Sequence, residues 1–268
     1  MALCGKAGRL FVLLAAAFSA AACVTMDPTV DVELTWDQAF VRVPGLIPVS
    51  LKEQRERQIA ELPPGTTFPT VIYMHGGGGL SPYAYKDIKI VQKAGFAVIA
   101  LNSYARTRPS NPGNDLNYTC PHGDCWAIDR NIFNFRNAEL KYALEQVRLL
   151  PWVDQNNLFG WGHSEGTYAM AAYPGAIFKA RIITGGGCAW GFAAEEPTLA
   201  VIARNDAYVA RHRLKHTRPS TCKKKSGNAS NLTYLEVPGN THNGAQTKAG
   251  KKALKEFLYS HITSAKAK

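Results

Sequence analysis

The sequence predicts an α/β fold with a doubly wound, mostly parallel sheet and helices on both of its faces. Short apolar runs alternate along the chain with longer amphipathic stretches, an order typical of strands that alternate with helices. Several of these runs are continuously apolar, as expected of strands that are covered on both sides. The chain has 268 residues, of which 46% are hydrophobic, so it can form one substantial core but not two comfortable domains.

The first 22 residues are expected to be a signal peptide and not part of this domain. Lys6 and Arg9 precede an apolar run over 10–22 that is too short to span a bilayer but suits the core of a secretory signal. The small residues directly before Cys23 resemble a bacterial lipobox, although Ala20 stands where that motif favours leucine. Cys23 would then be lipidated, 23–35 would form a tether, and 36–268 would be the folded domain.

The predicted export determines where the protein is expected to work and which partners are not expected. A lipid at Cys23 would hold the chain at a membrane surface, in the bacterial periplasm or at the outer membrane; the alternatives are release after cleavage or a retained membrane helix. The formal charge of +11 falls to +9 once the two cations Lys6 and Arg9 are removed, and much of it lies in 204–225 and 248–268. Nucleic acid is not an expected partner of an exported chain. These stretches are therefore interpreted as a solvated basic face, or as a surface for anionic membranes or acidic substrates.

Four cysteines remain in the exported chain, and they indicate disulfide bonds. An even set in an oxidising compartment favours pairing, and three pairings are possible. We favour Cys120–Cys125, a short ring worth about 2 kcal/mol, together with Cys188–Cys222, worth roughly 3–4 kcal/mol. A zinc site that includes His122 is the rival. No Cys or His partners stand at the usual spacings, so no metal is expected.

The expected elements follow one another in a simple order. The stretch 35–51, interrupted by prolines, suits one or two edge strands. The long segment 102–130 is interpreted as part of a substrate-pocket wall, because loops of this length in compact domains are usually functional or disordered. Apolar side chains at three- and four-residue steps make 131–149 the clearest helix. The other strands are expected at 68–74, 95–101, 158–161, 180–184, 197–203 and 232–237, and the other helices at 87–94, after 166 and at 247–262.

The stretch 158–173 contains the motif around which the predicted active site is built. Its apolar run breaks abruptly into Gly162-His163-Ser164-Glu165-Gly166, and small helix-tolerant residues follow. A strained turn between strand and helix is tolerated where the neighbouring residues are small, and the two glycines meet that need. In this context the G-x-S-x-G pattern predicts that Ser164 projects from the carboxyl edge of the sheet as a nucleophile, beside a helix N-terminus that favours a developing anion.

A second motif follows the predicted strand 68–74. His75 is followed by four glycines, 76–79, whose backbone is free to turn its N–H groups toward one point. A merely flexible loop is the alternative interpretation. Since oxyanion donors come from a loop beside the strand of the nucleophile, the position of this loop favours a role in binding an oxyanion.

A serine nucleophile needs a base, and the base needs a carboxylate that fixes its tautomer. Strand 197–203 leads into Asp206, and strand 232–237 leads through a short glycine-containing loop into His242. The predicted set is therefore Ser164, His242 and Asp206. The competing acids are Asp154, interpreted as a turn residue, and Glu195 and Glu196, which precede their strand. Of the competing histidines, one is in the glycine loop, one in the proposed small ring, one next to the serine but turned away from it, two before the last strand and one on the terminal helix: His75, His122, His163, His212, His216 and His261, in that order.

These motifs, in this order, resemble the α/β-hydrolase fold, and the chain over 68–262 looks like a member of the dienelactone-hydrolase type. The resemblance implies a Ser-His-Asp hydrolase without a cofactor, with the backbone N–H groups of Gly77 and Glu165 as oxyanion donors. One feature departs from the type: dienelactone hydrolases use a cysteine nucleophile, and this chain has Ser164 in that position. Dienelactone is therefore not carried over as the substrate.

The expected activity is the hydrolysis of small-molecule carboxylic esters through an acyl-enzyme. Two alternatives stay open on the sequence alone. The same three residues could serve a peptidase or amidase, because nothing in the sequence of the pocket decides between an ester and an amide. The chain could also be a catalytically silent lipoprotein that uses the fold as a binding module.

Overall fold

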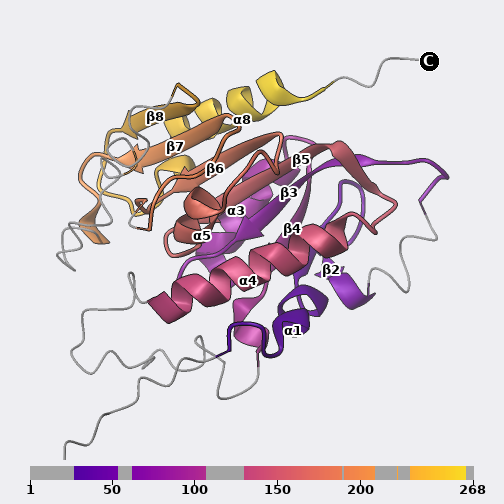
Figure 1. The fold of residues 1–268 in the computed structure, drawn as a ribbon. Helices are drawn as coiled ribbons and strands as arrows, with labels where there is room; N and C mark the ends of the chain where they lie inside the picture. Colours follow the sequence, from indigo (N-terminus) through magenta and orange to yellow (C-terminus); the bar gives the residue numbers. More distant parts are fainter. Residues whose placement is uncertain are drawn as a thin grey trace, which may run out of the picture.

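The computed structural model describes residues 27–53, 62–106, 130–188, 190–208, 222 and 230–263. These residues form an eight-stranded sheet with the order β2-β1-β4-β3-β5-β6-β7-β8 (Figure 1). All neighbouring strands from β4 to β8 run parallel, and β1 is antiparallel to both β2 and β4. The strands are β1 Phe40–Arg42, β2 Val49–Ser50, β3 Phe68–Met74, β4 Ala97–Leu101, β5 Val153–His163, β6 Ala180–Thr184, β7 Thr198–Ala203 and β8 Leu232–Val237.

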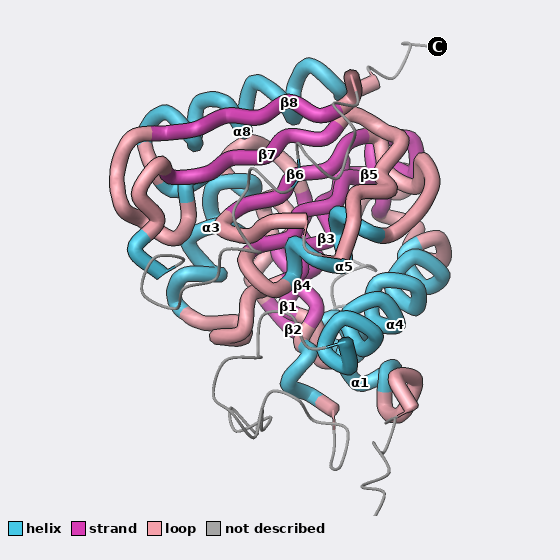
Figure 2. The backbone as a smooth tube through the Cα atoms, turned by 60° about the vertical axis from the view of Figure 1, so that its left-hand side comes forward, coloured by secondary structure: helices cyan, strands magenta, loops and turns pink. Residues whose placement is uncertain are grey.

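Helices cover both faces of the sheet, which confirms the predicted doubly wound architecture. Helices α1, α4 and α5 lie on one face and α3 and α8 on the other (Figure 2). The apolar side chains of the first group join one buried cluster, and those of the second group join another. The α-helices are α1 Val32–Asp37, α3 Pro82–Gln92, α4 Arg130–Val147, α5 Gly166–Ala172 and α8 Lys248–His261, and the short 3-10 helices are η2 Ser103–Ala105 and η4 Gly244–Gln246.

Strand β3 shows how the two clusters share the central strands. Val71 and Tyr73 point into the cluster with α3 and α8, whereas Ile72 and Met74 point into the cluster with α4 and α5. All four side chains are fully buried. A strand that is apolar on both of its faces is therefore confirmed at the centre of the sheet.

The predicted tether is wrong for its described part, residues 27–35. Helix α1 begins at Val32, its side chains at Val32 and Thr35 are buried, and the helix packs against α4. The guanidinium of Arg106 donates hydrogen bonds to the carbonyl oxygens of Pro28 and Val30, at 2.7 and 3.1 Å. The folded domain thus includes residues before 36, because the apolar side chains of this short helix have a long-range partner that local composition does not reveal.

Two elements begin five residues earlier than the sequence predicts. Helix α3 begins at Pro82 rather than at 87, with Ser81 as its N-cap residue, an arrangement that favours a helix start. Strand β5 begins at Val153 rather than at 158, because residues 154–157 are polar and mostly not buried and so give no signal of a buried strand. Among the described residues, no helix is long and apolar enough to cross a membrane.

Candidate active site

The turn between β5 and α5 has the strained geometry that the sequence predicts. Ser164 has a φ of 52°, in the left-handed region that L-residues with a side chain seldom adopt. A Cβ at Gly162 would stand 2.5 Å from the carbonyl oxygen of Gly166, and one at Gly166 would collide with the backbone of Met74. The Ser164 amide donates to the carbonyl of Thr184 at 2.8 Å. Close backbone packing therefore requires both glycines and fixes where the serine hydroxyl stands.

The structure brings together the three side chains that the sequence analysis selected. His242 Nε2 lies 2.8 Å from Ser164 Oγ, and His242 Nδ1 lies 2.7 Å from Asp206 Oδ2. Because an ionised carboxylate only accepts hydrogen bonds, the Nδ1–H donates to Asp206, which leaves Nε2 free to accept the proton of the serine hydroxyl. The arrangement can deprotonate the hydroxyl and keep the resulting imidazolium beside a negative charge.

The loops after β7 and β8 hold this arrangement through main-chain hydrogen bonds. Asn205 N–H donates to Gly239 O at 3.0 Å, and Ala207 N–H donates to Asn240 O at 3.1 Å. The two loops are therefore fastened to each other on both sides of Asp206. Parallel β7 and β8 bring the loops to the same edge of the sheet, as the sequence analysis expected.

Two rings flank the His242 imidazole. Tyr208 lies over it, with ring centroids 4.4 Å apart and planes inclined by 32°, and His163 meets it edge-on at 5.3 Å. Burial and the neighbouring His242 lower the pKa of His163 to about 3, so His163 is neutral and adds no charge beside the base. Tyr208 is not among the predicted site residues, and its only signal in the sequence is its aromatic character two positions after the predicted acid.

The glycine loop lies directly against Ser164. A Cβ at Gly76 would stand 2.8 Å from Ser164 Cβ and 3.3 Å from its hydroxyl oxygen. The loop is anchored by the buried His75: the Ser103 N–H donates to its Nε2 at 3.2 Å, so the proton is on Nδ1, which donates to Gly76 O at 2.6 Å. Burial and the charge of Arg136 hold the pKa of His75 well below its usual range. His75 therefore has a structural role in the loop.

The two residues expected to supply oxyanion donors stand on either side of Ser164. Gly77 is in the glycine loop, where the Tyr104 hydroxyl donates to its carbonyl oxygen. Glu165 precedes α5, and the first N–H groups of a helix have no partner within it. A Cβ at Gly77 would lie 3.2 Å from Glu165 Oε2, so the two segments are in contact.

The Glu165 carboxylate joins a buried charged cluster that the sequence analysis missed. It accepts a hydrogen bond from Arg136 Nε at 2.8 Å, and Arg136 in turn lies 3.3 Å from Glu139 on the same helix, α4. Both α4 side chains are almost completely buried. The one signal in the sequence was two charged residues, three positions apart, within the apolar stripe of the predicted helix.

A pocket of about 550 Å³ opens beside the three hydrogen-bonded residues. The pocket is lined by the glycine loop, by the His242 loop with Tyr208, and by the start of α3 at Tyr83 and Ala84. Its described lining residues are Gly76, Gly77, Gly78, Gly79, Ser81, Tyr83, Ala84, His163, Ser164, Tyr208, Thr241, His242 and Asn243.

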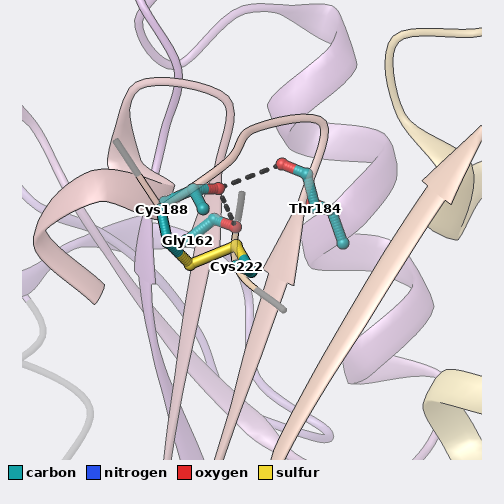
Figure 3. The surroundings of a disulfide bond; sticks show 5 residues. Gly162, Thr184, Cys188 and Cys222 are labelled. Atoms are coloured by element: carbon teal, nitrogen blue, oxygen red, sulfur yellow. Dashed lines mark hydrogen bonds between the residues drawn. A yellow bond between two sulfur atoms is a disulfide. The ribbon is translucent and has the colours of Figure 1, made fainter. Parts of the chain in front are cut away.

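The predicted pairing of Cys188 with Cys222 is confirmed, and the disulfide lies close to the site. Figure 3 shows it beside Gly162 and Thr184, at the carboxyl ends of β5 and β6. The loop that leads from β6 to Cys188 packs under the elbow, because a Cβ at Gly186 would stand 2.5 Å from the carbonyl oxygen of Ser164. The disulfide therefore lies at the end of the loop that packs against the backbone of Ser164.

The remaining predictions separate into two groups. Cys23, Cys120, Cys125, His122 and the larger part of the predicted pocket loop lie outside the described residues, as do His212 and His216. Within them, Asp154 caps a turn by accepting from Asn156 N–H at 3.0 Å, and Glu196 pairs with Arg181 at 2.6 Å, so neither faces His242. In the described residues, no three His, Cys, Asp or Glu side chains gather as a metal-binding group.

Comparison with solved structures assigns the fold. The chain is similar to a dienelactone hydrolase from Anabaena variabilis, with a TM-score of 0.50, 16% identity, and coverage of 74% of this chain and 87% of that one. It is equally similar, at 0.50, to a cold-adapted esterase from an Arctic intertidal metagenomic library, with 15% identity and coverage of 75% and 85%. Dipeptidyl peptidase 4 of Porphyromonas gingivalis also matches at 0.50, with 12% identity over 84% of this chain and 33% of that one.

These likenesses and the order of the strands confirm the predicted α/β-hydrolase fold. No protein-family model matches the chain, and no curated protein matches it.

Proposed function

We propose that the protein is a serine hydrolase that cleaves small or medium-sized carboxylic esters through an acyl-enzyme. The observation that carries the proposal is the chain of hydrogen bonds Ser164–His242–Asp206, which ends at a strained serine on the wall of a pocket of about 550 Å³. A pocket of this size suits a small organic molecule rather than a polymer chain. The esterase and the dienelactone hydrolase with the same fold support an ester as the substrate class.

The proposed reaction has two halves. In the first, His242 takes the Ser164 proton, the serine oxygen attacks the ester carbonyl carbon, and the alcohol leaves with the proton that His242 returns. In the second, His242 activates a water molecule that releases the acid and restores the serine. The negative charge on the tetrahedral intermediates would be bound by the backbone N–H groups of Gly77 and Glu165.

A fluorophosphonate probe tests the assignment of the nucleophile. We expect covalent labelling of the wild-type protein at Ser164 and no labelling of Ser164→Ala, with both proteins folded by circular dichroism. A panel of p-nitrophenyl esters of increasing acyl length then defines the pocket. Folded wild-type protein that neither reacts with the probe nor cleaves any ester would support the silent binding module instead.

A peptidase or amidase activity is the second candidate, favoured by the fold shared with a dipeptidyl peptidase. Comparison of an ester and an anilide of the same acyl group separates the two activities. We expect the ester to be cleaved with the higher kcat/KM. Cleavage of the anilide at a comparable rate would move the assignment to amide substrates.

We also propose that the protein is exported and anchored by a lipid on Cys23 at a bacterial membrane surface. The leader over 1–22 supports export, and a disulfide between Cys188 and Cys222 suits an oxidising compartment. Expression of the whole chain in a bacterium with labelled palmitate is the test. We expect label in the wild type and none in Cys23→Ser, whereas an unlabelled protein in the medium would indicate release after cleavage.

A further inference from the structure

A single buried side chain touches both segments that would bind the oxyanion. Arg136 lies on α4, outside the pocket lining, and is 2% exposed. Its Nη2 donates to the carbonyl oxygen of His75, two residues before Gly77, at 3.1 Å. Its Nε donates to Glu165 Oε1 at 2.8 Å, and Nη2 lies 2.7 Å from the same oxygen. The guanidinium thus links the glycine loop to the elbow.

The guanidinium is held in place from its other side. Ser103 accepts a hydrogen bond from Arg136 Nη1 and donates one to Glu139 Oε2 at 2.6 Å. The other oxygen of Glu139 lies 3.4 Å from Arg106 Nε. Two arginines and two glutamates therefore balance in charge within the core. Removal of one member would leave a buried charge without its partner, which is costly.

The charge balance of this buried cluster bears on the reaction, because one of its members is the Glu165 carboxylate beside the expected oxyanion site. Its Oε2 lies 3.2 Å from the point where a Cβ on Gly77 would stand, so a carboxylate is next to the amide expected to bind the oxyanion. Burial raises the pKa of Glu165, and the charge of Arg136 acts in the opposite direction. An unpaired carboxylate at this position would repel the negative charge that develops in the transition state.

We propose that Arg136 is a positioning residue for the oxyanion site: it fastens the glycine loop to the elbow and neutralises the Glu165 carboxylate beside the two amides. This inference rests on the proposed serine-hydrolase function. Arg136 does not touch the substrate, and it acts through the backbone of Gly77 and Glu165. Arg136 donates from Nε and Nη2, which lie in one rigid plane, and the single ammonium of lysine does not reproduce this geometry, so lysine is not an equivalent replacement.

The inference predicts a specific kinetic signature. In Arg136→Gln, kcat for a p-nitrophenyl ester should fall by about 10²–10³-fold, the cost of losing an oxyanion donor, while KM changes by less than about threefold. Arg136→Lys keeps the charge but not the fork, so its kcat should fall by about tenfold, which is less than in Arg136→Gln. An unchanged kcat in Arg136→Gln would overturn the proposal. If that variant does not fold, an unchanged kcat in Arg136→Lys would overturn it.

A second substitution separates the electrostatic role from a general structural role. The double variant Arg136→Gln/Glu165→Gln removes the unpaired carboxylate and keeps the backbone amide of residue 165. Its kcat should recover at least tenfold relative to Arg136→Gln. A double variant that is as slow as the single one would show that Arg136 does not act by neutralising Glu165.

Arg181 supplies the matched control, because it is an equally buried arginine paired with a glutamate. It lies 2.6 Å from Glu196 and donates to the carbonyl oxygens of Met170 and Tyr173, both at 2.7 Å. Arg181→Gln should lower stability as Arg136→Gln does but leave kcat per folded active site unchanged. A similar loss of kcat in both variants would overturn the positioning role.

Active sites are counted by titration with fluorophosphonate, which also separates the two proposals. If wild-type protein does not react with the probe, the proposed function fails. If wild-type protein reacts and turns over ester while Arg136→Gln is equally fast, the proposed function holds and the role of Arg136 is wrong.

Discussion

The Nε2 atom of His242 lies 2.8 Å from the hydroxyl oxygen of Ser164, although 78 residues separate the two along the chain. If this contact prepares a nucleophile, Ser164→Ala should lower kcat for a good ester by about 10⁴–10⁶-fold, since residues of such a set act as one unit. Steady-state assays at matched protein concentration measure the effect. Ser260→Ala, an exposed serine on α8, is the control and should retain full activity. A loss below tenfold in Ser164→Ala would reject the serine as nucleophile.

Asp206 accepts the Nδ1 proton of His242 at 2.7 Å and so sets the tautomer that leaves Nε2 free. In Asp206→Asn the amide can donate to Nδ1 and favour the opposite tautomer, with a proton on Nε2. We expect kcat to fall by about 10³–10⁴-fold with the fold intact. Asp154→Asn, at the opposite end of β5 from the serine, should change activity by less than twofold. Near-normal turnover in Asp206→Asn would mean that another group orients the histidine.

Neighbouring glycines in the 76–79 loop should respond differently to alanine. A Cβ at Gly76 would stand 2.8 Å from Ser164 Cβ, so Gly76→Ala must displace the loop or the nucleophile. A displacement of about 1 Å can cost on the order of 10²-fold in rate. A Cβ at Gly78 would meet only Ser81 Oγ, at 3.9 Å, so Gly78→Ala should cost less than about threefold. Equal effects of the two substitutions on kcat would contradict the close approach of this loop to Ser164.

The disulfide between Cys188 and Cys222 closes a segment of 34 residues. Chain entropy gives it about 3–4 kcal/mol of stability, so Cys188→Ser/Cys222→Ser should lower the free energy of unfolding by that amount in urea titrations. Cys120→Ser/Cys125→Ser provides the comparison and should cost about 2 kcal/mol if those residues also pair. Equal stability of the Cys188→Ser/Cys222→Ser variant and the wild type under non-reducing conditions would show that this bond does not form in solution.

The sequence predicted the sheet and the Ser-His-Asp set because their signals are local. Continuous apolar runs mark the buried strands, and the chemistry-bearing residues directly follow them, as Asp206 follows β7. The parallel order of the strands then places these residues at one edge. No contact between distant residues had to be known in advance.

The buried polar clusters could not be predicted in the same way. Arg136 and Glu139 are charged residues on a helix, and composition favours a solvated position for them. Their burial follows from partners 29 to 61 residues away, including the Glu165 carboxylate and the carbonyl oxygen of His75. Helix α1 was missed for the same reason, because it packs against α4, which is distant in the sequence.

Asp87 on α3 ties the segment after His242 to the core. Its carboxylate accepts hydrogen bonds from Tyr73 at 2.9 Å, from Asn243 at 2.7 and 2.8 Å, and from Gln246 at 2.8 Å. Burial raises the pKa of Asp87 from 3.8 to about 6, although these hydrogen bonds act in the opposite direction. The folded protein therefore binds the proton of Asp87 more tightly than the unfolded chain does.

The pH dependence of stability follows from this difference. Because the folded state holds the extra proton between about pH 4 and pH 6, the contribution of Asp87 to the free energy of unfolding decreases as the pH rises through that window. Below about pH 4 the contribution of Asp87 to the free energy of unfolding is fully present. Above about pH 6 it has been lost, and the loss stays constant, on the order of 3 kcal/mol. Asp87→Asn cannot titrate, so the wild-type free energy of unfolding minus that of the variant should fall from pH 4 to pH 6.5 and then level off. Urea titrations across this range measure the difference; a difference that is flat or rises with pH would show that Asp87 keeps an ordinary pKa in the folded protein.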